Sequence, residues 1–287
     1  MLFEDKINND MIRYSSKYVY VNSSFIETKS NLIIIDTMLF PRDGKELAEK
    51  KKAYNKDVRF IINTHWHSDH CYGNRFLADE KSEIIAHKDH LKTLAREKNV
   101  IKPDRKSFVK QKNLRYPDIT FDKKYDLECE GEKFKLFSLP GHSDDSIGIF
   151  WVGEKILFAG DTVLNSNDGH YSVPYFFWGN SSEMLISLKN ILQINSQLII
   201  PGHGMPVKPD KIKKDVLYLK NLKLSAKELY RESYSEEEFF AILKKEITPE
   251  KLLPEFKRSD FWVPRMHELN LKKTASEFID YFRKADQ

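Results

Sequence analysis

Short apolar runs of strand length follow one another through the first two thirds of the chain. Such runs, bounded by turn residues, are typical of β-strands. Two neighbouring runs, Val19–Ile26 and Leu32–Ile35, predict an antiparallel pair, and Gly153-Glu154 predicts a two-residue hairpin turn. One helix is predicted among the strands, at Lys45–Tyr54. The predicted strands are 19–26, 32–35, 58–62, 83–86, 134–139, 147–152, 155–158 and 198–200.

Helical spacing replaces this pattern in the last third of the chain. Apolar residues recur every three or four positions in Val216–Leu229 and again in Ala275–Phe282. Between them, Ser235 and Glu238 have the spacing of a helix capping box. Amphipathic helices need a partner surface, and no flexible linker precedes them, so we expect them to pack on the preceding domain. The polar segment Pro103–Lys124 is predicted as a long loop or insertion.

The segment Thr64–His70 carries the densest chemistry in the chain. It follows the apolar run Val58–Ile62 and places three histidines and one aspartate within six residues. Imidazole nitrogen and carboxylate oxygen are the ligands that zinc binds in proteins. Four such groups exceed what one ion usually takes while it still keeps water, so the segment predicts two metal ions.

Three further apolar strands each lead through glycine to one residue of the same kind. The sequences are Pro140-Gly141-His142, Ala159-Gly160-Asp161 and Pro201-Gly202-His203. Glycine lets the backbone turn sharply and approach a site closely. Each of these residues alone would be read as an ordinary loop or turn residue. Together with Thr64–His70 they predict one composite site, built where four strands end.

This pattern resembles the H-x-H-x-D-H signature of the metallo-β-lactamase superfamily, in its glyoxalase II-like form. The resemblance extends from about Tyr18 to Val207. It implies an α+β fold, a four-layer αββα sandwich of two mixed sheets with helices outside. We therefore expect residues 1–207 to form the catalytic domain and 208–287 to form a helical C-terminal extension packed on it.

The resemblance also implies how the ligands divide between two divalent ions. One ion would be held by His65, His67 and His142, the other by Asp69, His70 and His203. Asp161 would bridge the two. Zinc is the metal that this resemblance favours, with iron and manganese as alternatives.

A dinuclear centre of this kind implies a hydrolase that attacks a small ester, thioester or lactone with a metal-bound hydroxide. Asp69 is the candidate catalytic side chain, because it would lie beside the nucleophile and could orient or accept a proton. A phosphodiesterase or nuclease of the same fold, or an iron enzyme resembling persulfide dioxygenases, remains an alternative. True β-lactamases usually carry cysteine or serine in place of Asp161, and a glycine pair in place of Tyr72-Gly73, so the resemblance does not favour β-lactam cleavage.

Candidate substrate contacts follow the proposed bridging aspartate. They are His170, Tyr175 and Trp178, although core packing is the simpler role for the two aromatic residues and a polar loop position is the simpler role for His170. Cys71 adjoins the signature and is expected to be a packed thiol. The remaining histidines are expected to be structural: His87 and His90 at the surface, and His267 either capping the C-terminal helices or closing the pocket.

Composition narrows the partners. The net charge is +4 over 287 residues and no basic run is long, so no nucleic-acid partner is expected. No apolar stretch approaches the ~18 residues that span a bilayer, so no membrane partner is expected either. The chain starts without a signal-peptide pattern and has two cysteines, which favours the cytoplasm. A small-molecule substrate fits these observations, and the oligomeric state stays open.

Overall fold

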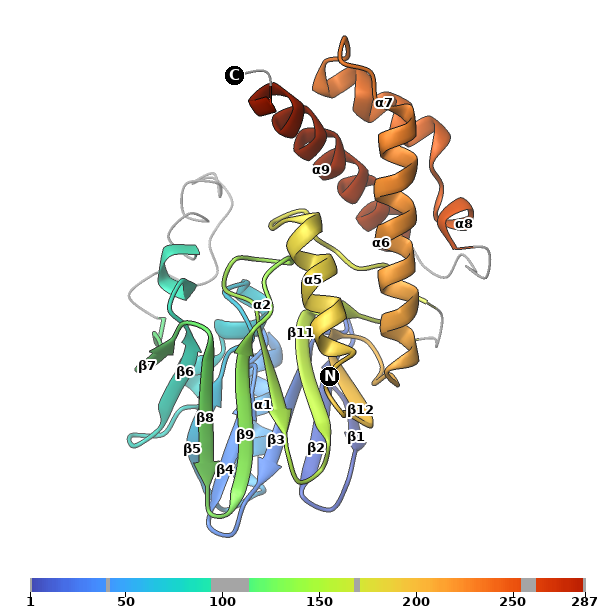
Figure 1. The fold of residues 1–287 in the computed structure, drawn as a ribbon. Helices are drawn as coiled ribbons and strands as arrows, with labels where there is room; N and C mark the ends of the chain where they lie inside the picture. Colours follow the sequence, from blue (N-terminus) through green and yellow to red (C-terminus); the bar gives the residue numbers. More distant parts are fainter. Residues whose placement is uncertain (1, 40–41, 94–113, 168–170, 254–261, 286–287) are drawn as a thin grey trace.

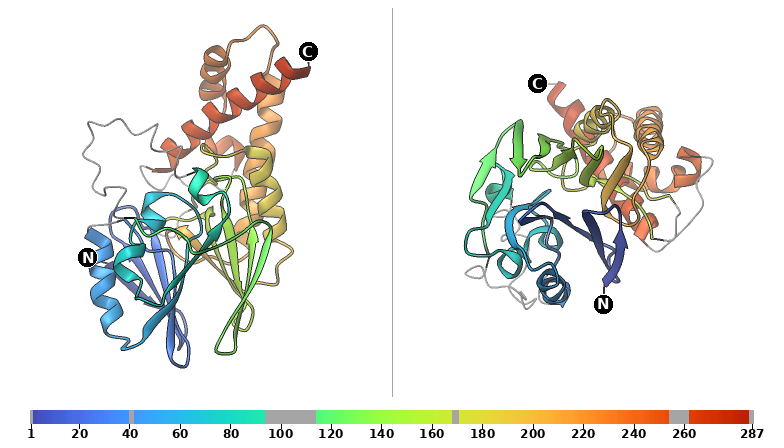
Figure 2. Two further views of the ribbon diagram at one scale, coloured as in Figure 1. Left: turned by 90° about the vertical axis from the view of Figure 1, so that its left-hand side faces the viewer. Right: turned by 90° about the horizontal axis from the view of Figure 1, so that it is seen from below.

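The structure is a computed structural model, and it describes residues 2–39, 42–93, 114–167, 171–253 and 262–285. Two β-sheets face each other, and helices cover their outer sides (Figures 1 and 2). This arrangement confirms the predicted α+β sandwich. The first half of the predicted loop at 103–124, residues 103–113, lies outside the described residues, and its described half contains a strand, β7 (Ile119–Phe121).

The first sheet has seven strands in the order of the sequence. The predicted antiparallel pairing of two N-terminal runs is confirmed, since Ser24–Glu27 pairs with Leu32–Ile35. Strands β1 to β4 are antiparallel, whereas β4 to β7 run parallel, so the sheet is mixed. Its strands are β1 (Leu2–Lys6), β2 (Met11–Ser16), β3 (Asn22–Glu27), β4 (Asn31–Ile35), β5 (Asp57–Ile62), β6 (Glu83–His87) and β7.

The second sheet has five strands in the order β12-β11-β10-β9-β8. The turn between β10 and β11 is longer than predicted: Trp151 pairs with Ile156, so four residues connect the strands rather than two. Lys155 turns the chain there in the left-handed conformation, with φ of 54°. The strands are β8 (Lys124–Cys129), β9 (Glu132–Ser138), β10 (Ile147–Trp151), β11 (Ile156–Leu164) and β12 (Leu198–His203).

Apolar side chains fill the space between the sheets and beneath the outer helices. The inner faces meet in one core, which includes Ile33 and Ile62 from the first sheet and Leu136 and Ile149 from the second. Outside the first sheet, Leu47 of α1 (Arg42–Lys52) packs in a separate core. Outside the second sheet lies α5 (Ser181–Ile191). Two short helices, α2 (Ser68–Cys71) and α3 (Asn74–Leu77), lie at the ends of the strands.

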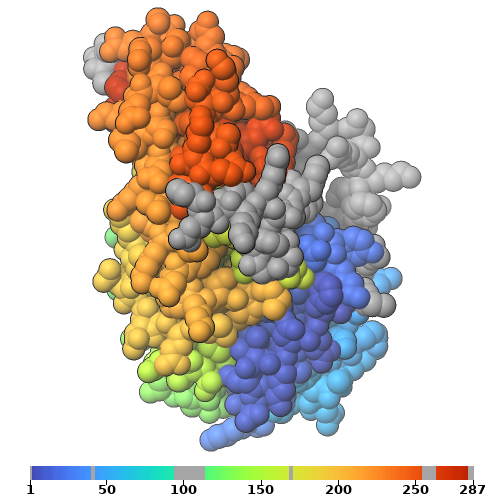
Figure 3. All heavy atoms as spheres, turned by 90° about the vertical axis from the view of Figure 1, so that its right-hand side faces the viewer, coloured from blue at the N-terminus to red at the C-terminus, as the bar shows by residue number. Residues whose placement is uncertain are grey.

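Four further helices form the C-terminal region above the sandwich (Figure 1). Their buried residues, among them Leu222, Leu243 and Ala275, join one core with Leu157 and Ile199 of the second sheet. The space-filling view shows the orange helices and the yellow and blue parts of the sandwich as one continuous surface (Figure 3). The helices are α6 (Asp210–Leu229), α7 (Glu236–Glu246), α8 (Pro249–Leu252) and α9 (Trp262–Ala285).

Two histidines expected at the surface are buried instead. His87 is 4% exposed and His90 is 2% exposed. The reason lies in strand β7, which the sequence pattern did not reveal: Phe121 on that strand packs its ring edge-on against His87, at 6.1 Å between centroids. His90 has a different partner: its Nδ1 lies 3.1 Å from an Asp145 carboxylate oxygen.

Candidate metal centre

The seven residues that the sequence pattern singled out, four in the signature and three after later strands, come together at one end of the two sheets. His65 and His67 follow β5, and Asp69 and His70 lie on α2 directly after them. The other three come from the second sheet: His142 follows β9, Asp161 lies within β11, and His203 ends β12. Strands that end at the same edge of a sandwich thus deliver all seven side chains.

A first group consists of His65, His67 and His142, whose ring nitrogens converge with one carboxylate oxygen of Asp161. His67 Nδ1 lies 2.9 Å from His65 Nε2 and 3.0 Å from His142 Nε2. Asp161 Oδ2 lies 3.5 Å from His142 Nε2 and 3.9 Å from His65 Nε2. These four atoms all lie within 4.8 Å of one another, which is the size of one metal site.

A second group adjoins the first. His70 Nε2 lies 3.3 Å from His203 Nε2, and Asp69 Oδ2 lies 3.4 Å from the same His203 atom. Asp161 reaches this group as well, because its Oδ1 lies 3.3 Å from His70 Nε2 and its Oδ2 lies 3.5 Å from His203 Nε2. One carboxylate therefore stands between the two groups, where a bridging ligand would stand.

Glycine is required where the second sheet brings these groups together. Gly202 packs directly against the carboxylate of Asp161, so a Cβ atom there would overlap it. Gly141 has φ of 136°, in the range that favours glycine, and lies against the backbone of Met184 on α5. The glycines that precede His142 and His203 are thus explained by close packing at the site.

The outer ring nitrogens of four histidines are held by oxygen atoms, which leaves the inner nitrogens to face one another. In the first group, where burial keeps the rings neutral, inner nitrogens that point their lone pairs at a common point repel unless a cation lies between them. The donor set therefore fits metal ions, and imidazole with carboxylate suits zinc. The outer contacts are His65 Nδ1 to Thr64 Oγ1 at 3.1 Å, His70 Nδ1 to Asp36 Oδ2 at 2.8 Å, His142 Nδ1 to Tyr175 O at 2.8 Å and His203 Nδ1 to Val19 O at 2.6 Å.

The ionisation of the first group suits metal binding at neutral pH. Burial lowers the pKa of His65, His67 and His142, and that of His67 falls to about 3. These rings are therefore neutral at pH 7 and have a free lone pair. Burial opposes the charge of Asp161, but the field of the neighbouring histidines, His203 foremost, holds the pKa of that carboxyl well below its usual range.

The second group carries positive charge of its own. Burial opposes the charge of His70 and His203, yet Asp161 raises the pKa of both rings, that of His203 to about 10. Asp69 is partly exposed; desolvation opposes its charge, but the field of His70 holds the pKa of its carboxyl below the usual range. Two cationic rings thus balance two carboxylates, and a metal ion bound here would displace the ring protons.

A cavity of about 490 Å³ opens onto the two groups. Tyr175 and Trp178, two of the three predicted substrate contacts, line it, and the ring of Trp178 lies 6.1 Å from that of His67. The third, His170, lies outside the described residues. Whether the C-terminal helices reach the pocket was left open by the sequence, and the structure answers it: Arg265, Met266 and Leu269 of α9 line the same cavity.

His267, whose role the sequence left open, and Cys71, expected to be a packed thiol, both have structural contacts. His267 does not line the cavity; its Nδ1 lies 2.8 Å from Tyr218 Oη and its Nε2 lies 3.0 Å from Ile247 O, so it holds C-terminal helices together. Cys71 is buried, with its Sγ 3.2 Å from the Trp66 carbonyl oxygen. Both environments are those of packed side chains.

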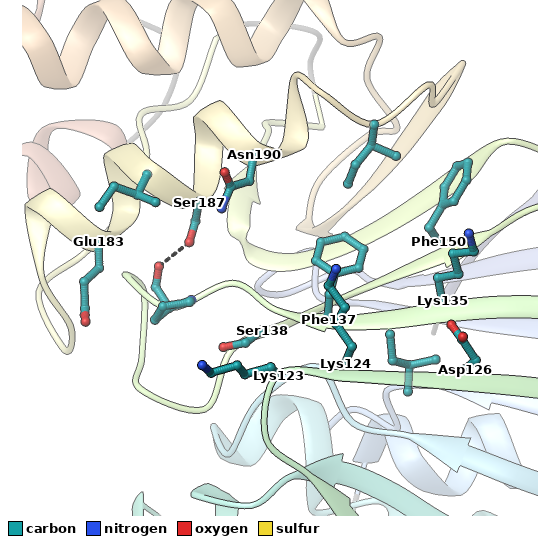
Figure 4. Close-up of a pocket in the computed structure, with 14 residues that line it drawn as sticks. Lys123, Lys124, Asp126, Lys135, Phe137, Ser138, Phe150, Glu183, Ser187 and Asn190 are labelled. Atoms are coloured by element: carbon teal, nitrogen blue, oxygen red, sulfur yellow. Dashed lines mark hydrogen bonds between the residues drawn. The ribbon is translucent and has the colours of Figure 1, made fainter.

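A wider groove of about 820 Å³ lies elsewhere, between α5 and strands β8 and β9 (Figure 4). Phe137 and Phe150 form part of its floor, and three lysines line it: Lys123, Lys124 and Lys135. Among the described residues that line it there is no histidine or cysteine. Its size therefore does not make it a metal centre, and the clustered histidines and aspartates open onto the smaller cavity instead.

The sequence profile of the metallo-beta-lactamase superfamily matches residues 17–203. The chain belongs to this superfamily. That confirms the family resemblance, and the matched residues contain all seven candidate ligands.

Curated relatives of this superfamily member are distant. The chain is 26% identical over 189 residues to a beta-lactamase-like protein 2 homolog of Caenorhabditis elegans, which covers 64% of this chain and 55% of the relative. It is 26% identical over 175 residues to a hydroxyacylglutathione hydrolase of Prochlorococcus marinus (strain MIT 9312), which covers 61% of this chain and 60% of the relative. The chain thus spans little more than half the length of these relatives.

Solved structures share the fold at low sequence identity. A metallo-beta-lactamase from Pontibacter korlensis aligns with a TM-score of 0.64 at 18% identity, over 77% of this chain and 100% of that one. The sec-alkylsulfatase Pisa1 from a Pseudomonas species aligns with a TM-score of 0.72 at 14% identity, over 97% of this chain and 50% of that one. Among the described helices, none is both long and apolar enough to cross a bilayer.

Proposed function

We propose that this protein is a dinuclear metal-dependent hydrolase of a small ester, thioester or lactone. The observation that carries the proposal is the position of Asp161, whose two oxygens reach both groups of inward-facing histidine nitrogens. His65, His67 and His142 would hold one ion, and Asp69, His70 and His203 the other. Zinc is the metal we propose on the basis of this donor set, with iron and manganese as the alternatives.

Divalent ions bound here would lower the pKa of water toward neutrality and so supply the nucleophile. Asp69 would orient that nucleophile or accept its proton: it lines the cavity, and its carboxyl is ionised at neutral pH because its pKa is low. The proposed substrate lies against Trp178 and Tyr175, whose rings form the wall next to His67 and His142.

The cavity suits a substrate that combines an apolar part with an anionic part. Its lining exposes more apolar than polar surface, with Trp66, Trp178 and Met266 among the residues that contribute. Arg265 is the one lysine or arginine among the described residues that line it. An acyl group could lie on the aromatic wall while a carboxylate elsewhere in the substrate pairs with the guanidinium. The hydroxyacylglutathione hydrolases among the relatives make a thioester a reasonable first substrate to assay.

Metal quantification followed by a substrate panel tests the proposal. We expect about two metal ions per chain, and turnover of a thioester or lactone at a higher kcat/KM than bis(p-nitrophenyl) phosphate or a cephalosporin. A phosphodiester preference of tenfold or more, about 1.4 kcal/mol in transition-state binding, would overturn the substrate class. Iron as the bound metal in anaerobically purified protein, without hydrolysis of any ester, would favour the non-hydrolytic alternative.

A further inference from the structure

Helix α9 is connected to the candidate ligand His142 through a single side chain, Asn270. This asparagine is completely buried, and α9 lies in the C-terminal region rather than in the sandwich. Its side-chain amide forms hydrogen bonds on both sides of Tyr175: Nδ2 donates to Pro174 O at 2.7 Å, and Oδ1 accepts from Phe176 N at 3.2 Å. The segment that it holds has no regular secondary structure, so no strand ladder fixes its backbone.

The planar peptide bond between Tyr175 and Phe176 links the Asn270 contact to the orientation of His142. The Tyr175 carbonyl and the Phe176 N–H belong to one planar peptide unit and point in opposite directions. The N–H of this unit donates to Asn270, and its carbonyl accepts from His142 Nδ1 at 2.8 Å. When Asn270 holds the N–H, it therefore sets the direction of the carbonyl and, through it, the orientation of the imidazole.

The orientation of the Asn270 amide follows from its partners. Pro174 offers only a carbonyl, which needs a donor, and Phe176 offers an N–H, which needs an acceptor. Tyr218 Oη lies 3.3 Å from Asn270 Nδ2, and the same hydroxyl lies 2.8 Å from His267 Nδ1. Buried bonds of this kind polarise one another and leave the amide one favourable orientation.

We propose that Asn270 is a positioning residue for the metal centre: it fixes His142 with Nδ1 protonated and Nε2 directed at the other ligands. The proposal rests on the metal centre proposed above. The alternative is that Asn270 only attaches α9 to the sandwich, in which case its loss would lower stability without a specific effect on His142.

Asn270→Ala and Thr274→Val form a matched pair that separates the two roles. Thr274 lies one turn further along α9, is 1% exposed, and donates only to the main-chain oxygen of Asn270, at 2.8 Å. Both variants lose buried hydrogen bonds of the same helix. A third variant, Asn270→Asp, keeps an oxygen for the Phe176 N–H but loses the donor to Pro174.

Two readouts are needed, and neither depends on turnover. The first is metal affinity, measured by competition with a chromophoric chelator; the second is the Nδ1–H signal of His142 in metal-free protein labelled with ¹⁵N-histidine, assigned by its absence in His142→Gln. We expect Asn270→Ala to weaken metal binding about tenfold, as loss of an outer hydrogen bond of a metal-binding histidine does, and to lose or broaden the signal. Thr274→Val should match the wild type within twofold, and Asn270→Asp should retain the signal.

The outcomes separate this inference from the proposed function. If Asn270→Ala kept both the metal affinity and the His142 signal, or if Thr274→Val changed them equally, the positioning role would be wrong. If the wild-type protein bound no metal, the metal centre would fail, and the His142 signal would still decide the role of Asn270. If Asn270→Ala did not fold, loss of the signal in Asn270→Asp, whose acceptor for the Phe176 N–H remains, would contradict the proposal.

Discussion

Asp36→Asn should disrupt both groups of candidate ligands from outside, because one buried carboxylate connects them. Oδ1 of Asp36 accepts from the Thr64 N–H at 2.8 Å. Oδ2 accepts from Thr64 Oγ1 at 2.7 Å and lies 2.8 Å from His70 Nδ1. The backbone tolerates the change, since φ at this position is 57° and asparagine adopts that conformation as readily as aspartate. The shape is kept, but one oxygen becomes an NH₂ donor.

The new amide has one orientation that fits. Because the Thr64 N–H needs an acceptor, the amide oxygen should stay at the Oδ1 position, which turns the NH₂ toward His70 Nδ1. In the neutral ring that metal binding requires, His70 Nδ1 must then accept, so the one ring proton stays on Nε2, which faces Asp161 and His203 and is no longer available to a metal ion. Outer partners of metal-binding histidines are worth 10- to 100-fold in affinity, about 1.4–2.8 kcal/mol. We expect a loss of that size at the second group and a smaller one at the first, where Thr64 Oγ1 contacts His65.

Chelator competition at fixed pH measures this loss as two separate affinities per chain. Ser23→Ala is the matched control: it removes a hydroxyl that donates to the main-chain oxygen of Asp36 at 2.7 Å and leaves the carboxylate in place. That control should cost about 1 kcal/mol of unfolding free energy and keep both metal ions. Wild-type affinity for two ions in Asp36→Asn would show that the carboxylate does not set the His70 tautomer.

The remaining predictions concern the bridge, the cavity and the C-terminal helices. Asp161→Ala should lose one metal ion and most activity while the fold survives, because two cations would then face each other unscreened. Metal content and circular dichroism together measure this. Two retained ions with full turnover would exclude Asp161 as the bridge. Arg265→Gln should raise the KM of a carboxylate-bearing substrate about fivefold and leave the KM of a neutral ester unchanged, since a partly exposed ion pair is worth up to about 1 kcal/mol. Arg231→Gln, outside the cavity, is the control. Equal effects of Arg265→Gln on both substrates would contradict the anion contact. Deletion of residues 208–287 exposes the core shared with α6 to α9 and should give insoluble protein, so a soluble and fully active truncation would refute that dependence. Burial lowers the pKa of His267, so as pH falls below about 6.5 the unfolded chain binds a proton at this ring before the folded chain does. The free energy of unfolding should therefore fall there, by at most about 1.4 kcal/mol per pH unit. Urea unfolding of His267→Gln between pH 5 and 8 should give a flatter pH profile, and an unchanged profile would show that the ring does not contribute.

Strands with continuous apolar runs could be predicted from the sequence, because burial on both faces leaves a strong local signal. Strand β11 (Ile156–Leu164), buried at every position, is predicted only in its first part, since the apolar run ends at Phe158 and the strand continues through Gly160 and Asp161. Strand β2 (Met11–Ser16) was missed because its buried positions include Arg13, Ser15 and Ser16, which are polar in sequence. One terminal nitrogen of Arg13 finds its acceptors only in the folded chain, Asn22 Oδ1 at 2.7 Å and Gly204 O at 2.8 Å. Helix α5 was not predicted either. Its N-terminal cap is Asn180, whose side chain accepts from the N–H groups of Ser182 and Glu183, and asparagine is typical of turns as well as of caps.

The inner ligand set was predictable because its chemistry is concentrated locally. Four of the seven residues lie between His65 and His70, and each of the others follows a strand and a glycine. The structure places all seven together, which local pattern and strand topology explain jointly. The metal roles remain predictions, as does the substrate role of Tyr175 and Trp178, although both line the cavity.

Three of the four outer contacts of the same site could not be predicted, because each of the three joins segments that are remote in the sequence. Asp36 is 34 positions from His70, Tyr175 is 33 positions from His142, and Val19 is 184 positions from His203. Two of these three acceptors are main-chain carbonyls, which every residue possesses, so no choice of side chain marks them. Metal ligands can be recognised in a sequence by their residue type. The groups that orient them can be identified only from their position in the folded structure. Asn270 extends this logic one step further, since it acts on a carbonyl that acts on a ligand. If its role is verified, the affinity of this metal centre depends on a helix that the signature does not include.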